Sequence, residues 1–156
     1  MSASDESRLS PVTAGPGMGA QGARIVGGAC SDDGPGPEVM AADTLAGDPV
    51  VEARGEDLGK VGEIMIDVRR GRVAYAVLAS GGFLGIGDKL FAIPWSALTL
   101  DADRKCFVLD VDRRRLEHAH GFDKDHWPSM GDPQWAAEVH SYNGARPYWQ
   151  DPAALQ

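Results

Sequence analysis

The sequence predicts a mainly β fold: a small sheet that curls into a barrel, with short C-terminal helices and a disordered N-terminal tail. Three observations support this prediction. Residues 49–111 consist of short apolar runs separated by turn residues, and several runs alternate apolar with polar side chains. One run, residues 72–80, is apolar on both of its faces. Residues 1–40 are instead crowded with Gly, Pro, Ser and Ala and contain no aromatic residue.

The segment 1–40 is expected to be a disordered tail. Its composition cannot bury enough apolar surface to offset the entropy that the chain loses on ordering. Met40 stands immediately before the first patterned residues, so the segment is either a functional tail or an extension upstream of an alternative start. In both cases we expect a chain that begins at Met40 to fold as well as the full one.

The barrel domain is assigned to residues 41–118. Its strands are expected to be short runs rich in β-branched and aromatic residues, with the period of two that buries one face of a sheet. The sequence RRG at 69–71 supplies a tight hairpin in which Gly71 can adopt a positive φ. The expected strands are residues 49–53, 62–68, 72–80, 89–94 and 105–111.

The run RVAYAVLAS at 72–80 indicates that both faces of the sheet are covered. Alternate side chains of a strand point to opposite faces, so Tyr75 lies on one face and Leu78 on the other. When a small sheet curls on itself, one face lines the interior. The apolar outer face therefore needs a cover from elsewhere in the chain.

Residues 119–156 are expected to form that cover as an aromatic extension that packs on the barrel. Asp112 can cap a short helix that precedes the extension and stops at Gly121. Asp132 followed by Pro133 is the start signal of a second helix. The extension has a large apolar surface to dock because it carries three tryptophans, Trp127, Trp135 and Trp149.

Composition narrows the function classes. The formal net charge of -8 and the sequence pI of about 4.8 repel phosphate backbones and anionic membranes, which argues against a nucleic-acid partner and against membrane insertion. No apolar run approaches the length of a membrane-spanning helix, and the N-terminus has no apolar signal-peptide core. Only Cys30 and Cys106 are present, which predicts no disulfide framework. We therefore expect a soluble cytoplasmic protein.

The glycine-rich stretch GGFLGIGDK at 81–89 has the glycine content of a phosphate-binding loop but lacks the other residues that such a loop requires. Gly82 and Gly87 have the separation that the G-x-x-x-x-G-K-[ST] motif requires. Asp88, however, occupies the lysine position and places a carboxylate where an anion would bind. We interpret this stretch as a structural loop that joins two strands.

Four motifs carry a family resemblance: GEDLG at 55–59, GGFLGIG at 81–87, IPWSAL at 93–98 and GFDKDHWP at 121–128. In these the chain resembles the PRC-barrel family, which includes the cytoplasmic part of the photosynthetic reaction-centre H subunit and the C-terminal domain of the ribosome maturation factor RimM. The likeness extends over residues 44–149 and is greatest to stand-alone bacterial members. It implies a small PRC-type β-barrel that serves as an assembly or scaffold module.

Residues with catalytic or metal-binding chemistry do not form a convincing site. The densest group of possible metal ligands lies between residues 118 and 126, and its spacing fits no known metal site. Two of its histidines lie only two residues apart, and the loop that follows them lacks the glycine and glutamate of a calcium site. Cys106 sits in an apolar run, where a thiol stays protonated and inert. We therefore assign no catalytic residue, metal or cofactor. The group comprises His118, His120, Asp123, Asp125 and His126.

The function expected from the sequence is a non-enzymatic interaction module that binds a protein partner. The alternative is an RNA- or ribosome-associated maturation factor that uses the arginines at 69–72 and 113–115, although their acidic neighbours dilute the charge. We also expect self-association as a dimer, because exposed apolar residues usually mark an interface. The candidate interface residues are Leu78, Phe83, Leu84, Trp95 and Trp127.

Overall fold

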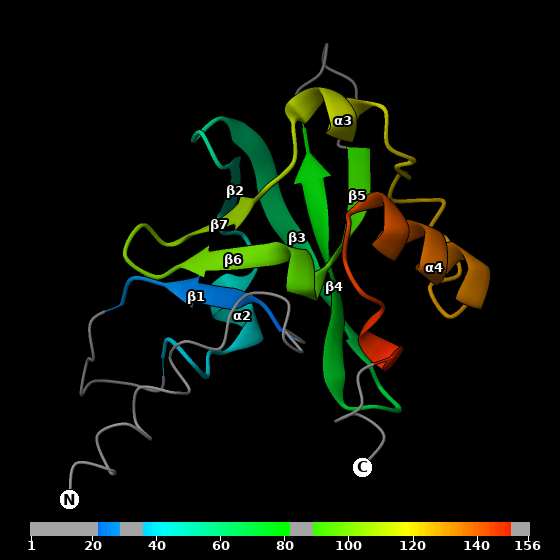
Figure 1. Cartoon of the computed structure of the whole chain (residues 1–156), viewed down its shortest axis with the longest axis horizontal. Helices are drawn as coiled ribbons and strands as arrows, with labels where there is room; N and C mark the ends of the chain where they lie inside the picture. The colour runs from blue at the N-terminus through cyan, green and yellow to red at the C-terminus, as the bar shows by residue number, and fades with distance from the viewer. Residues whose placement is uncertain (1–21, 29–35, 82–88, 151–156) are drawn as a thin grey trace, which may run out of the picture.

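The computed structural model describes residues 22–28, 36–81 and 89–150, and its centre is one seven-stranded sheet (Figure 1). The strands are β1 (Arg24–Val26), β2 (Pro49–Glu52), β3 (Asp57–Asp67), β4 (Arg72–Ser80), β5 (Lys89–Pro94), β6 (Leu98–Asp101) and β7 (Cys106–Leu109). The helices are α2 (Ala42–Leu45), α3 (Arg113–Glu117) and α4 (Pro133–Tyr142), with single 3₁₀ turns η1 (Trp95–Ala97) and η2 (Tyr148–Gln150). The mainly β class expected from the sequence is confirmed.

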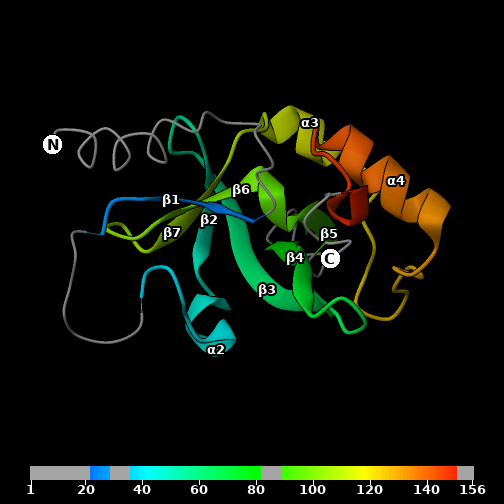
Figure 2. The ribbon, with the colours of Figure 1, turned by 60° about the horizontal axis from the view of Figure 1, so that its bottom comes forward.

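The sheet curls but does not close into a complete barrel. Its spatial order is β1-β6-β7-β2-β3-β4-β5, and the two end strands β1 and β5 are not paired with each other. The pairing of β3 with β4 shifts register twice: Gly62 of β3 is an extra residue between Val61 and Glu63, and Ala74 of β4 is an extra residue opposite Met65 and Ile66. Such bulges bend a strand and increase its twist. Figure 2 shows the resulting curve of β3 along the sheet, with α3 and α4 together on one side.

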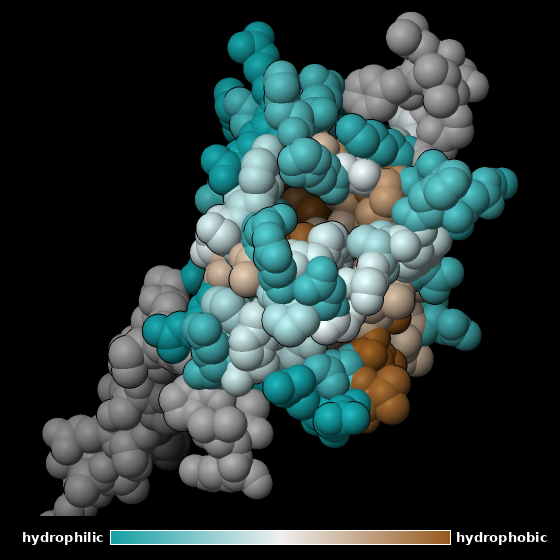
Figure 3. All heavy atoms as spheres, turned by 90° about the vertical axis from the view of Figure 1, so that its right-hand side faces the viewer, coloured by the Kyte–Doolittle hydropathy of each residue, from teal (hydrophilic) through white to brown (hydrophobic). Residues whose placement is uncertain are grey.

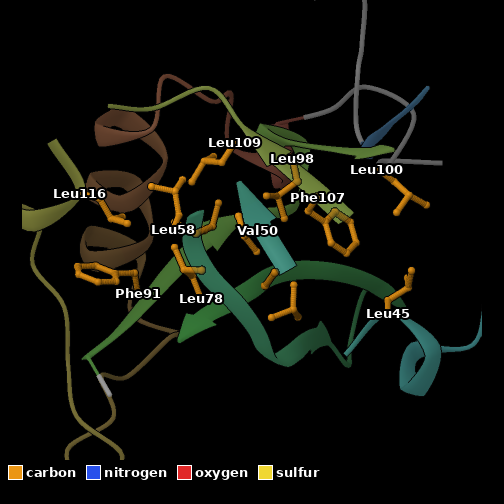
Figure 4. Close-up of a cluster of buried hydrophobic side chains, with 13 residues drawn as sticks. Leu45, Val50, Leu58, Leu78, Phe91, Leu98, Leu100, Phe107, Leu109 and Leu116 are labelled. Carbon is orange, nitrogen blue, oxygen red and sulfur yellow. The ribbon is translucent and has the colours of Figure 1, made fainter. Parts of the chain in front are cut away.

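The concave side of the sheet encloses the main hydrophobic core, in which side chains from strands and helices converge (Figure 4). Phe107 is completely buried at its centre, and the ring of Trp95 packs edge-on against it with centroids 5.6 Å apart. Leu116 of α3 seals one end of this core, and Leu45 of α2 also belongs to it. The core residues are Leu45, Val50, Leu58, Val61, Ala76, Leu78, Phe91, Ile93, Leu98, Leu100, Phe107, Leu109 and Leu116.

The turn and capping signals are confirmed. Gly71 has φ +67° in the β3–β4 hairpin. The Asp112 carboxylate accepts a hydrogen bond from the Arg114 backbone N–H at 2.9 Å, and Asp132 caps α4 in the same way. Pro133 opens α4, where its missing N–H costs nothing. Helix α3 is shorter than expected because it ends at Glu117 rather than near Gly121.

Two strands were not expected from the sequence. Strand β6 follows directly after η1, and its alternate residues Leu98 and Leu100 point into the core. Strand β1 lies within the segment expected to be disordered, and it pairs in parallel with β6 from Arg24 to Val26. The prediction of disorder is therefore wrong for these residues: pairing with β6 and the packing of the adjacent Ala23 against the main core order them, although their own side chains remain exposed. Residues 1–21 and 29–35 of the expected tail and the glycine stretch 82–88 lie outside the described residues.

Replacing Phe107 with alanine should lower the free energy of unfolding by about 3–5 kcal/mol, because the cavity left by a fully buried ring cannot collapse completely. Val68→Ala is the matched control, since Val68 is 90% exposed and its truncation should change stability by less than about 0.5 kcal/mol. Urea denaturation followed by tryptophan fluorescence measures both. Equal midpoints for the two variants would contradict the placement of Phe107 in the core.

Chains that begin at Gly22 and at Met40 should both fold, but only the shorter one should melt at a lower temperature than the full chain. The shorter chain loses the pairing of β1 with β6 and the contact of Ala23 with the main core. We expect a decrease of a few degrees, roughly what about 1 kcal/mol costs a domain of this size. Differential scanning calorimetry tests this. A lower melting temperature already in the Gly22 chain would show that residues before it contribute to stability.

Candidate functional site

The C-terminal extension covers the outer face of β4 and β5, as the sequence predicts. Helix α4 lies beside β5 (Figure 1). Ala74 and Tyr75 of β4 and Ala92 of β5 form a second buried cluster beneath it. The half-buried residues that pack on this cluster are Met65, Phe122, Met130, Trp135, Val139 and Tyr148. We call the surface made by α3, α4, η2 and the edge of β5 the C-terminal face.

Polar contacts fix the end of the extension to the β3–β4 hairpin. The Tyr148 hydroxyl donates to Asp67 Oδ2 at 2.6 Å, and Arg72 Nη1 donates to the Tyr148 carbonyl at 3.4 Å. Partial burial disfavours the charged form of Asp67, but hydrogen bonds from Tyr148 and Arg70 outweigh it and hold the pKa of that carboxyl below its usual value. Burial and then the bond to Asp67 raise the pKa of Tyr148 to about 12. A neutral tyrosine and an ionised aspartate therefore form this contact at neutral pH.

His140 of α4 is buried in an aromatic cluster between the extension and β4. Its side chain is 1% exposed, and its ring centroid lies within 5.0–5.7 Å of those of Tyr75, Tyr148 and Trp149. Nδ1 lies 2.7 Å from the Ala136 carbonyl oxygen, so this nitrogen carries the proton that it donates. Burial lowers the pKa of His140 despite that bond. The neutral imidazole is thus the form that fits the folded chain.

An apolar hollow of about 320 Å³ opens between α3, α4 and the edge of β5. Figure 3 views this side of the molecule and shows hydrophobic surface at the bottom of a depression framed by hydrophilic side chains. Leu116 and Ala119 line one wall, and Trp135 and Val139 of α4 line the other. The polar residues at the hollow are His120, Glu138 and Asn143. We call this cavity the apolar hollow.

A larger, polar groove of about 790 Å³ runs between β6–β7 and residues 142–148. Three arginines line it, Arg24, Arg115 and Arg146, and two carboxylates, Asp110 and Asp112. We call it the arginine groove. Its wall and that of the apolar hollow share Val111, Tyr142 and Asn143, so the two cavities are neighbours on the C-terminal face.

The contact between Arg115 and Tyr142 joins α3 to the end of α4 at this shared wall. The Tyr142 hydroxyl donates to the Arg115 carbonyl at 2.6 Å, and Arg115 Nη2 donates to the Tyr142 carbonyl. The guanidinium carbon lies 4.6 Å from the centre of the Tyr142 ring, within the range of a cation–π contact. These contacts hold the Arg115 side chain in one place at the border of the two cavities.

The family model described as PRC-barrel domain matches residues 37–116, just over half of the chain. The chain belongs to the PRC-barrel family. A search of the curated proteins finds no match. The PRC-barrel match ends at Leu116 in α3, so it contains strands β2 to β7 and the Leu116 part of one wall of the apolar hollow. The other wall, on α4, comes from the extension beyond the match, and the C-terminal face is therefore a joint surface of the PRC-barrel domain and its extension.

The structure separates the five candidate interface residues. Leu78 is 1% exposed and belongs to the main core, so its inclusion is wrong: the curling of the sheet turns this side chain inward. Trp95 is half-buried against Phe107 and does not lie on the C-terminal face. Trp127 is 40% exposed and packs beside Phe122. Phe83 and Leu84 lie outside the described residues.

The residues with metal-ligand chemistry make local contacts. His118 Nδ1 lies 2.7 Å from the Arg114 carbonyl oxygen, and His126 Nδ1 lies 2.8 Å from Asp123 Oδ1. Over residues 22–28, 36–81 and 89–150, no three His, Cys, Asp or Glu side chains come together as metal ligands would. His120 borders the apolar hollow, and Cys106 is buried. Within the same described ranges, no helix is long and apolar enough to cross a membrane.

Sequence reasoning missed both cavities of the C-terminal face. Arg24 falls in the expected tail and Arg146 near the end of the extension, and neither residue stands in a motif. Arg115 belongs to the run 113–115, but nothing in that run distinguishes it from its neighbours. The only available signal was the expectation that the extension docks on the sheet, since a docked helix leaves cavities at its borders.

The stability of the protein should decrease as pH falls below about 6.5. Above that value His140 is neutral in both states, whereas below it the unfolded chain binds a proton that the buried imidazole resists. His140→Phe keeps a ring in the cluster and should flatten the dependence of the unfolding free energy between about pH 7 and 5. The exposed His118→Gln is the control and should behave as the wild type. A wild-type slope in His140→Phe would show that another group causes the dependence.

Proposed function

We propose that this PRC-barrel protein is a non-enzymatic interaction module that binds a protein partner through its C-terminal face. The observation that carries the proposal is the apolar hollow. It is open to solvent between two helices and the edge of a strand, and its walls are mostly aliphatic and aromatic. An apolar cavity at the surface is costly unless something fills it, and interfaces between proteins are typically anchored by one large side chain in such a pocket.

The size and the rim of the hollow suit a partner side chain. A volume of about 320 Å³ exceeds that of a leucine, methionine or phenylalanine side chain. Glu138 is exposed at the rim, where it can remain solvated beside a bound segment. The core of the site is thus apolar and its border polar, which is the usual arrangement of a protein interface.

An RNA- or ribosome-associated role is the alternative, and the arginines that motivated it, at 69–72 and 113–115, give it little support. Arg70 forms an ion pair with Asp67 at 3.0 Å. Arg113 lies 3.7 Å from Glu56 and 3.5 Å from Glu117. Their charges are largely used within the chain and sit beside carboxylates that would repel a phosphate backbone. Salt-dependent RNA binding that Arg114→Gln weakens would favour this alternative.

Self-association remains a proposal, and the structure supports it less than the sequence does. The doubly apolar strand β4 motivated it, but the extension of the same chain covers the outer face of that strand. A second copy is therefore one of the partners that the C-terminal face could bind. Sedimentation velocity at tens of micromolar, roughly where weak interfaces still hold, decides whether the chain is a monomer.

Ala119→Phe should fill the apolar hollow and remove partner binding. Ala137→Phe is the matched control, because Ala137 is exposed on α4 and does not line the hollow. Affinity capture from the native cell followed by mass spectrometry should recover a protein with the wild type and with Ala137→Phe, and much less of it with Ala119→Phe.

Because Ala119 also touches the main core, circular dichroism must show that Ala119→Phe is folded. Glu138→Arg, at the exposed rim, gives an independent test that leaves the core intact. Capture of the same proteins by all variants would contradict binding at the hollow.

A further inference from the structure

We infer that the arginine groove and the apolar hollow together receive an acidic peptide segment of a partner protein. One large apolar residue of the segment enters the hollow, and its neighbouring carboxylates face Arg24, Arg115 and Arg146. This inference rests on the proposed function and adds the chemistry of the partner to it.

The first support is that the three arginines converge from distant parts of the chain. Arg24 belongs to β1 at one end of the sheet, Arg115 to α3, and Arg146 to the segment between α4 and η2. Within the described residues, neither Arg24 nor Arg146 has an ion-pair partner. Two unpaired guanidinium groups at one groove form a site for anions.

The second support is the charge balance of the groove against that of the chain. The whole protein carries a formal net charge of -8, whereas the lining of the groove has three arginines against Asp110 and Asp112. The Asp112 carboxylate already accepts the Arg114 N–H as the cap of α3. The groove therefore has a small excess of positive charge on an acidic chain, and it favours carboxylates more than the rest of the surface does.

Arg115 determines how the two cavities act together. Its contacts with Tyr142 hold it at the shared wall, and a guanidinium group has five N–H donors, so several remain for a ligand. An arginine held in one rotamer loses less entropy when it binds a carboxylate. A carboxylate next to the anchoring residue of a bound segment would meet Arg115 first.

The edge of β5 favours a peptide over a small anion. Leu90 exchanges both backbone hydrogen bonds with Phe122 at this edge, N to O at 2.8 Å in each direction. Alternate residues of a strand turn their backbone groups to the same edge, so Ala92 directs its N–H and C=O there as well. Ala92 lines the apolar hollow. A peptide backbone in the hollow can pair with the Ala92 groups, as in strand addition at other sheet edges.

The test uses the full chain and a fluorescein-labelled peptide of Asp and Glu with a central Leu-Phe pair. About twelve residues suffice, since an extended segment rises ~3.3 Å per residue and needs to span both cavities. Fluorescence anisotropy should show saturable binding in the micromolar range that weakens as salt is added. Two control peptides have either Lys in place of every acid or Ser in place of the Leu-Phe pair, and both should bind at least about tenfold more weakly.

The variants assign the contacts. The double variant Arg24→Glu, Arg146→Glu should bind the acidic peptide about tenfold or more weakly than the wild type. Both residues are exposed, and the two substitutions reverse the charge of the groove. Arg104→Glu is the control: this exposed arginine lies in the β6–β7 turn away from the groove and should bind like the wild type. Equal loss in Arg104→Glu, equal binding of the Lys peptide, or no saturable binding of the acidic peptide would overturn the inference.

Failure of the inference is distinguishable from failure of the proposed function. The cellular partner could still be captured by the Arg24→Glu, Arg146→Glu variant but not by Ala119→Phe. In that case the hollow binds a partner that is not acidic, so the inference is wrong and the proposed function stands. If capture is insensitive to Ala119→Phe and to Glu138→Arg, both fall. Preferential binding of single-stranded RNA over the acidic peptide would also overturn the inference.

Discussion

Strand β4 is apolar from Val73 to Ala79, and residues 74–80 are all buried. Ala76 and Leu78 pack into the concave core, while Ala74 and Tyr75 face the extension. Buried strands of this kind need cover on both sides, because one exposed apolar face would be a site for aggregation. The curl of the sheet supplies one cover and α4 supplies the other. The other elements of the fold hold these two covers in place on β4.

The two cavities of the C-terminal face are consequences of this cover. A single helix laid on a curved sheet cannot follow its whole surface, so gaps remain where α4 meets α3 and where the chain returns across β6 and β7. Apolar burial provides most of the docking energy, and the Asp67–Tyr148 and Arg115–Tyr142 contacts fix where the extension ends and how it approaches α3.

Much of the fold is predictable from local patterns. Strands β4 and β5 and the caps at Asp112 and Asp132 follow from alternation and helix-start signals, which act between residues close in sequence. Strand β6 has only four residues and carries no turn signal before it, since η1 leads into it directly. Strand β1 is ordered by backbone pairing with β6, and such pairing leaves no trace in the side chains of an exposed edge.

The sequence by itself determined the fold class, the need for a second cover on β4, and the residues able to provide it. Hydrophobic periodicity encodes which faces are buried, and composition encodes which segments lack a core. Only the tertiary structure decided that Leu78 faces inward, that the hollow lies at the edge of β5, and that Arg24, Arg115 and Arg146 share one groove. These facts depend on which segments meet when the sheet curls and the extension returns, and no local pattern specifies contacts between residues so far apart in the chain.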